Sequence, residues 1–181
     1  MKKLITSCTF LVFVLLMSAC KNEKSLQSYL VDASGKEGYF TGDIPVSSVL
    51  TPKSEVSEET KEVLSSIKKI NVVYLQKTAD NSDQYEAEKA KLKAIFKDNS
   101  TYKSLGKMKA KGMNVNVYYA GNTDAVDEVV AFGYSNEAGV GVARLLGENM
   151  NPSKIMEILN DVQMEGDGTG LGPLGKIING I

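Results

Sequence analysis

The residue of this chain with the clearest capacity for covalent chemistry is Cys20. The sequence holds two cysteines, and the other one, Cys8, lies inside an apolar run that extends from Leu4 to Met17. Cys20 follows the small residues Ser18 and Ala19 directly after that run, and a charged stretch begins immediately after it. Removal of the apolar run leaves Cys20 as a lone thiol, which is either free or committed to a bond outside the chain.

The residues before Cys20 have the pattern of an export signal. Lys2 and Lys3 form a positive n-region, and the apolar run has the length of an h-region. The run is shorter than the roughly 20 apolar residues that cross a bilayer. We therefore expect residues 1–19 to be a signal peptide that is removed.

The end of the run, "LMSAC", resembles a bacterial lipobox, in which the cysteine is acylated and becomes the mature N-terminus. This resemblance predicts a palmitate-type lipid on Cys20 that holds the protein on a membrane. The alternative is an ordinary signal peptide that is cut near Ala19 and leaves Cys20 unmodified. With the lipid on Cys20, residues 20–25 are expected to tether a single domain over residues 26–163.

The residue types that are missing exclude several activities. The sequence contains no histidine, which rules out Ser-His-Asp and Cys-His catalysis and histidine-ligated metals. It contains no tryptophan either, which weakens a carbohydrate-binding interpretation. Carboxylate pairs, Ser-Lys sites and oxygen-ligated metals remain, but no spacing favours them. A net charge of −1 gives no reason to expect nucleic acid as a partner. We therefore expect no enzyme, no cofactor and no nucleic-acid binding.

Arg144 is the sole arginine, and it falls in an apolar stretch on the face expected for Val140, Val142 and Leu146. It is a candidate anchor for a ligand carboxylate. The simpler interpretation is an ion pair with an acidic neighbour or a position at the sheet edge. Tyr118 is a further candidate for ligand binding, although strand tyrosines more often pack one face of a sheet.

Asp124, Asp127 and Glu128 cluster where a hairpin begins, and such carboxylates are candidates for ligand or calcium binding. The spacing of an EF-hand is absent, so we expect no metal here. The glycine-rich stretch "GDGTGLG" lacks both the G-x-G-x-x-G and the P-loop pattern. Residues 164–181 are therefore expected to form a flexible tail.

Hydrophobic periodicity places these residues on expected helices and strands. In chain order we expect a helix with apolar residues between 26 and 33, a helix capped by Ser57, a strand over 70–76, a helix over 84–97 with a capping box between Asp83 and Glu86, an antiparallel meander from 103 to 147, and a helix capped by Asn151. This order predicts an α+β fold with a mostly antiparallel sheet, a C-terminal meander and helices packed on one face.

The same order of segments resembles a known family. The segments "INVVYLQ", "DQYEAEKAKLKAIFKD" and "VDEVVAFGYSNEAGVGVARLLGENMNPSKIMEIL" are together similar to the Bacteroidetes lipoprotein family called domain of unknown function 4252. The resemblance covers roughly residues 25–163, and the ending after Glu165 departs from it. It implies a small envelope lipoprotein of unassigned function, without known catalytic residues.

The sequence thus predicts a membrane-anchored envelope lipoprotein, located at the outer membrane, that acts as a non-enzymatic binding module for another envelope protein. A small-molecule or glycan-binding accessory of an uptake system is the alternative. The stretch Lys21–Lys24 matches the surface-export signal of Bacteroidetes lipoproteins only in part. The periplasmic and the surface-facing leaflets both remain open.

Overall fold

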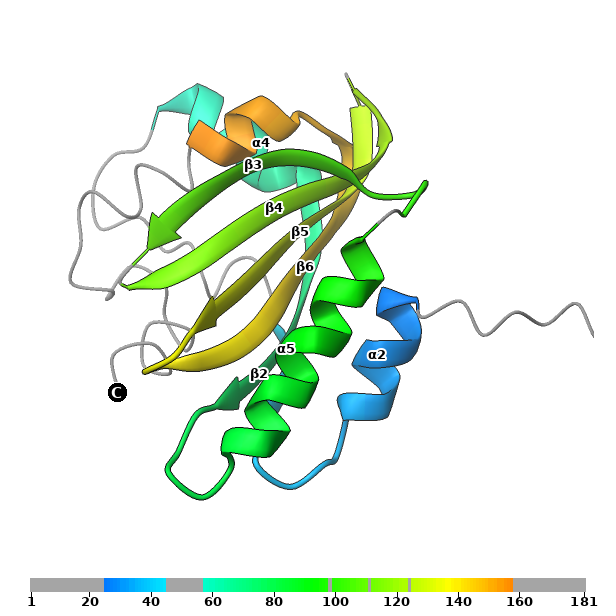
Figure 1. Cartoon of the computed structure of the whole chain (residues 1–181). Helices are drawn as coiled ribbons and strands as arrows, with labels where there is room; N and C mark the ends of the chain where they lie inside the picture. Colours follow the sequence, from blue (N-terminus) through cyan, green and yellow to red (C-terminus); the bar gives the residue numbers. More distant parts are fainter. Residues whose placement is uncertain (1–24, 45–56, 98, 111, 124, 158–181) are drawn as a thin grey trace, which may run out of the picture.

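The computed structural model describes residues 25–44, 57–97, 99–110, 112–123 and 125–157 (Figure 1). The expected signal peptide, Cys20, Asp124 and the expected tail lie outside these residues. The elements are α2 (Leu26–Ala33), β1 (Tyr39–Ile44), α4 (Glu58–Ser66), β2 (Ile67–Gln76), α5 (Ser82–Phe96), β3 (Lys103–Ala110), β4 (Met113–Asn122), β5 (Ala125–Ser135) and β6 (Gly139–Met150). Residues 152–157 are also helical.

The strands form one six-stranded sheet in the order β1-β2-β6-β5-β4-β3. Every neighbouring pair is antiparallel. Strands β3 to β6 follow one another as the expected meander, and β2 joins the meander along β6. The predicted α+β class with an antiparallel sheet is therefore confirmed.

The helices, however, cover both faces of the sheet instead of the one face that we expected. Helices α2 and α5 pack on one face, whereas α4 and the helical residues 152–157 lie against the other (Figure 1). We call these the α5 face and the α4 face. Each face has its own hydrophobic cluster, and β2, β5 and β6 contribute side chains to both.

Strand β2 explains why one covered face is not enough. Val73 and Leu75 belong to the cluster on the α5 face, whereas Ile70 and Val72 belong to the cluster on the α4 face. A continuous apolar run in a strand, such as "INVVYLQ", is typical of burial on both faces. The helices must therefore be shared between the two faces.

Helix starts follow the expected caps at two of three positions. Ser57 Oγ accepts a hydrogen bond from Thr60 N (3.2 Å), and Asn151 Oδ1 accepts one from Lys154 N (3.1 Å). The capping box expected at the start of α5 was wrong. That helix begins after Asn81, whose side chain bonds backbone groups of the preceding turn and leaves the helix without a side-chain cap.

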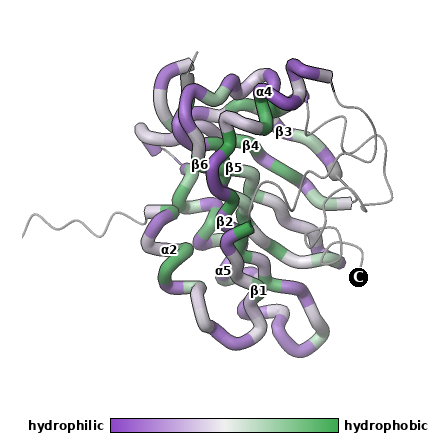
Figure 2. The backbone as a smooth tube through the Cα atoms, turned by 180° about the vertical axis from the view of Figure 1, so that it is seen from behind, coloured by the Kyte–Doolittle hydropathy of each residue, from purple (hydrophilic) through white to green (hydrophobic). Residues whose placement is uncertain are grey.

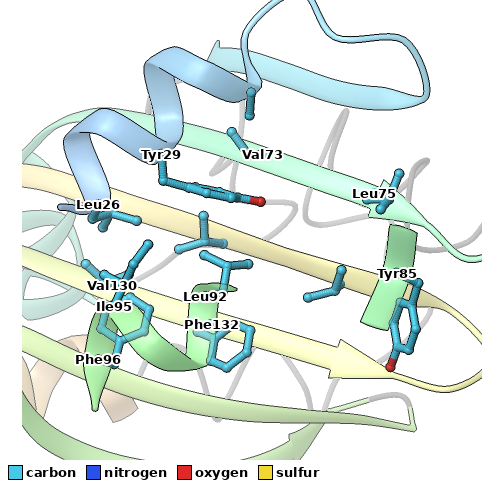
Figure 3. Packing of buried hydrophobic residues seen from close by; sticks show 13 residues of the cluster. Leu26, Tyr29, Val73, Leu75, Tyr85, Leu92, Ile95, Phe96, Val130 and Phe132 are labelled. Carbon is cyan, nitrogen blue, oxygen red and sulfur yellow. The ribbon is translucent and has the colours of Figure 1, made fainter. Parts of the chain in front are cut away.

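Packing on the α5 face depends on the aromatic rings that α2 and α5 bring to the sheet. Tyr29 extends from α2 over the strands, and Phe96 lies beside Phe132 (Figure 3). The tube of α2 carries both hydrophobic and hydrophilic stretches, as an amphipathic helix does (Figure 2). Leu26, Tyr29 and Ala33 are its buried residues.

The close approach of β6 to β2 requires a residue without a side chain. A Cβ atom on Gly141 would lie 2.6 Å from the carbonyl oxygen of Val73 and 3.0 Å from the ring of Tyr74. A Cβ atom on Gly106 in β3 would instead meet only the end of Met156, at 3.5 Å. The two positions therefore form a matched pair.

We expect Gly141→Ala to lower the free energy of unfolding by about 2–3 kcal/mol, because the backbone of β2 must move. Gly106→Ala should change it by less than about 1 kcal/mol, because the added methyl group meets a flexible side chain. Chemical denaturation of both variants measures the difference. Equal losses at the two positions would contradict the close approach of β6 and β2.

Candidate functional site

A groove of about 560 Å³ lies between α2 and the strands β1, β2 and β6. Gln27, Leu30 and Val31 of α2 form one wall. The sheet supplies the floor, whose polar residues are Thr41, Asp43, Lys69, Asn71 and Arg144. The groove therefore combines an apolar helix wall with a polar floor, which is the composition of many ligand sites.

Strand register assembles the floor. Asp43 of β1 is paired with Asn71 of β2, and Asn71 is paired with Arg144 of β6. Cross-strand partners point to the same face, so the three side chains form a row across three strands. An acid, an amide and a guanidinium group thus lie next to one another on the α5 face.

Two side chains hold the carboxylate of Asp43. Lys69 Nζ lies 2.7 Å from its Oδ2 atom, and Asn71 Nδ2 donates a hydrogen bond to Oδ1. The hydrogen bond from Lys69 is the largest cause that lowers the pKa of Asp43 below its usual value. The side chains of Lys69 and Asp43 are 49% and 62% exposed, so water and a ligand can both reach this pair at the mouth of the groove.

Arg144 is held from two sides. Its Nη2 atom lies 2.8 Å from Glu128 Oε2, and its Nη1 atom donates a hydrogen bond to Gln27 Oε1. The side chains of Arg144 and Glu128 are only 15% and 12% exposed. The expected ion pair with an acidic neighbour is therefore present. Because Arg144 also lines the groove, its role as a ligand anchor stays a prediction.

Glu128 is fixed in turn by Tyr102, whose hydroxyl donates a hydrogen bond of 2.7 Å to Oε1. Burial, followed by the effect of Glu128, raises the pKa of Tyr102 above its usual value. Tyr102, Glu128, Arg144 and Gln27 thus form one hydrogen-bonded chain. This chain orients the guanidinium group before any ligand arrives, which reduces the cost of binding.

Asp127 and Glu128, the two described members of the expected acidic cluster at the hairpin, are not brought together. Glu128 points to Arg144, whereas Asp127 is exposed next to it on the strand. Asp124 lies outside the described residues. No group of three or more potential metal-ligating side chains occurs within the part of the chain that the structure describes.

Tyr118 is a packing residue in this fold. Its ring stacks on Phe96 with centroids 4.4 Å apart and an angle of 6° between the planes. Burial raises the pKa of its hydroxyl. Tyr118 does not line the groove.

Glu88 is a buried acid on α5. The residue is 9% exposed and faces Tyr29 and Tyr39, and its Oε2 atom has no hydrogen-bond partner among the described residues. Lys91 Nζ lies 3.8 Å from the other oxygen. Burial is the largest cause that raises the pKa of Tyr39 to about 12, and the nearby Glu88 is the second. The same two causes raise the pKa of Tyr29 even more.

The sequence did contain a signal for Glu88. It lies three residues after Tyr85 and four before Leu92, on the apolar stripe of α5. Asp43, Lys69 and Asn71, in contrast, gave no local signal, because only the strand register brings them together.

The chemistry that this arrangement supports is recognition by hydrogen bonds and charge. Among the described residues, no hydrogen bond joins a lysine to a serine hydroxyl, which a Ser-Lys site would need.

No helix in the described ranges has the length and apolar character to cross a bilayer.

The family model described as Domain of unknown function (DUF4252) matches residues 34–158. The chain belongs to this family. No curated protein and no solved structure matches the chain. The matched DUF4252 region includes the whole groove floor, whereas α2 and its residue Gln27 precede it.

We expect the buried pair of the DUF4252 domain to be strongly coupled. Glu128→Ala should lower the free energy of unfolding by about 3 kcal/mol, because it leaves Arg144 charged and nearly buried without a counter-ion. The double variant Arg144→Met/Glu128→Leu should recover most of this loss. Denaturation of the single and double variants measures the coupling, and additive losses would contradict it. The matching substitution in the exposed ion pair between Lys61 and Glu58, Glu58→Ala, is the control. It should change the free energy of unfolding only a little.

Stability should also fall at alkaline pH. Burial favours the protonated forms of Tyr29, Tyr39 and Tyr102, whose pKa values are raised in the folded state. Unfolded tyrosines ionise near pH 10, so this stabilisation is complete below about pH 10 and is lost as the pH rises through about 12. Denaturation between pH 8 and 12 measures the slope. Tyr39→Phe should reduce it, and an unchanged slope would exclude Tyr39 as a contributor.

Proposed function

We propose that this protein is a lipoprotein of the cell envelope that is held on a membrane by acyl chains on Cys20. Its DUF4252 domain acts as a non-enzymatic binding module for another envelope protein. The lipobox pattern supports the anchor, and the side of the domain formed by α2 and β1 supports the binding role. We call this side the α2–β1 surface.

The observation that carries the binding role is that the exposed large apolar side chains of the described ranges lie on α2 and β1, the two elements of this surface. Val31 and Phe40 are 62% and 37% exposed, and they are the exposed large hydrophobic residues of the described ranges. Val31 belongs to the groove wall, whereas Phe40 is paired with Tyr74 and points to the opposite face of β1. Exposed apolar side chains of this kind are typical of protein interfaces.

The edge of β1 supplies a second kind of contact. Within the described part of the chain, β1 pairs with β2 and with no other strand. An edge strand offers backbone N–H and C=O groups to an added strand. A partner segment that pairs with β1 would bring alternate side chains over the groove and over Phe40.

The proposed anchor lies close to this surface in the chain. Cys20 precedes Ser25, the cap of α2, by five residues. An extended chain of that length spans at most about 17 Å. The anchored domain would therefore present the start of α2, including Gln27, near the membrane.

A second candidate is a small-molecule or glycan-binding accessory of an uptake system. The groove volume of about 560 Å³ falls within the range of small-molecule sites. None of the residues that line the groove is aromatic, which weakens the glycan version, because sugar rings commonly stack on aromatic side chains.

Site-specific photo-crosslinking in cells tests the proposal. A photoreactive residue at position 31 or 40 should give a discrete crosslink to an envelope protein. The same residue at the exposed position Ala90 on α5 is the control and should give none. Labelling with radioactive palmitate, compared with Cys20→Ala, tests the anchor in the same cells.

The outcomes separate the two parts of the proposal. A chain that is not labelled at Cys20 is not a lipoprotein, whatever it binds. Equal crosslinking at positions 31, 40 and 90 rejects the α2–β1 surface as the contact. A labelled chain without any crosslink favours the second candidate if a small metabolite raises its free energy of unfolding. The same metabolite should give no such rise in Arg144→Met.

A further inference from the structure

Another surface, away from the groove, is formed by lysines that make no ion pair among the described residues. Lys93 lies on α5, and Lys107 and Lys109 lie on β3. All three side chains are exposed. The ion pairs of the described residues involve other lysines. We call these three residues the lysine patch.

The register of the sheet gathers the patch on one face. Lys109 is paired with Asn114, and Asn114 is paired with Tyr134 of β5. Tyr134 packs against the hydrophobic cluster of the α5 face, so the whole row points to that face. Lys93 Nζ of α5 lies 4.6 Å from the centre of the Tyr134 ring and completes the row.

A second row runs beside the first. Lys107 is paired with Asn116, and Asn116 is paired with Phe132, which is buried under α5. Asn114 is exposed, and Asn116 and Tyr134 are partly exposed. The patch therefore combines ammonium groups with amide groups and the edge of an aromatic ring.

The charge of β3 and β4 is one-sided, although Glu86 on α5 lies within electrostatic reach of Lys93. The strands β3 and β4 contain no acidic residue, whereas β3 alone carries Lys103, Lys107 and Lys109. The whole chain has a net charge of −1, so the excess of positive charge here is local. Such a local field attracts polyanions and makes their binding depend on salt.

We propose that the lysine patch binds an anionic polysaccharide whose charges are carboxylate groups. Lysine ammonium groups pair with such carboxylates, and Asn114 and Asn116 donate and accept hydrogen bonds with sugar hydroxyls. Phosphate recognition by a fork of arginine is absent, because Arg144, the sole arginine, lies in the groove.

This step rests on the proposed anchor, which places the membrane near the start of α2. The patch lies away from that point, and this position favours a polymer over the membrane surface as its ligand. The start of α2 contacts Arg144 through Gln27, and Arg144 is paired with Val130. The Tyr134 row lies four residues further along β5, which is about 13 Å, and Lys109 lies two strands beyond it. Figure 1 accordingly shows the end of β3 on the side opposite to α2.

Binding of polygalacturonate to the full chain, purified in detergent, tests this inference. We expect saturable binding that weakens as salt is added, and no binding to uncharged dextran. The variant Lys107→Gln/Lys109→Gln should bind about tenfold more weakly at low salt, because two ionic contacts are lost. Lys93→Gln on α5 should weaken binding without touching the edge strand.

The variant Lys36→Gln/Lys68→Gln is the matched control. It removes the same charge from exposed lysines that form no described ion pair, and its binding should stay within about twofold of the parent chain. An equal loss in the control would overturn the proposal, because net charge alone would then explain the binding.

Two further results would also overturn it. Tighter, patch-dependent binding to vesicles that contain phosphatidylglycerol would assign the patch to a lipid surface. Aggregation of Lys107→Gln/Lys109→Gln without any change in binding would show that these lysines only protect the edge of the sheet.

Discussion

The burial of β2 on both faces is the constraint on which the rest of the fold depends. Ile70 and Val72 must be covered on one side, and Val73 and Leu75 on the other. Burial of one such side chain stabilises the folded state by roughly 1.5–3 kcal/mol, so neither face can remain open. Helices α2 and α5 therefore pack on one face, while α4 and the helical residues 152–157 cover the other.

The same strand also creates the groove. Because β2 lies between β1 and β6, its polar residue Asn71 lies between Asp43 on one neighbour and Arg144 on the other. The groove begins where the apolar residues of β2 give way to polar ones on the α5 face. The hydrogen bonds behind Arg144 then keep its charge at a fixed place in a partly apolar environment, where an electrostatic contact is stronger than in water.

Local sequence patterns predicted most of the elements and little of the site. Alternation located the meander, and the caps at Ser57 and Asn151 were confirmed. The pattern of β2 already indicated burial on both faces, but it was interpreted as an ordinary strand. Asp43, Lys69 and Gln27 reach the groove only through strand register and the docking of α2, and no local pattern encodes either of these.

The helix wall and the sheet floor of the groove lie on different sides of the boundary of the family match. The floor, with Asp43, Asn71 and Arg144, lies within the matched family region, whereas α2 precedes it. Yet α2 is firmly attached to the sheet. Leu26 and Tyr29 are buried in the hydrophobic cluster of the α5 face, and Gln27 accepts a hydrogen bond from Arg144. In the proposed anchored form, α2 both closes the groove and connects the domain to the acylated cysteine. A substitution on the groove side of this one short helix would therefore change the wall of the groove and leave the floor, which lies within the matched region, as it is.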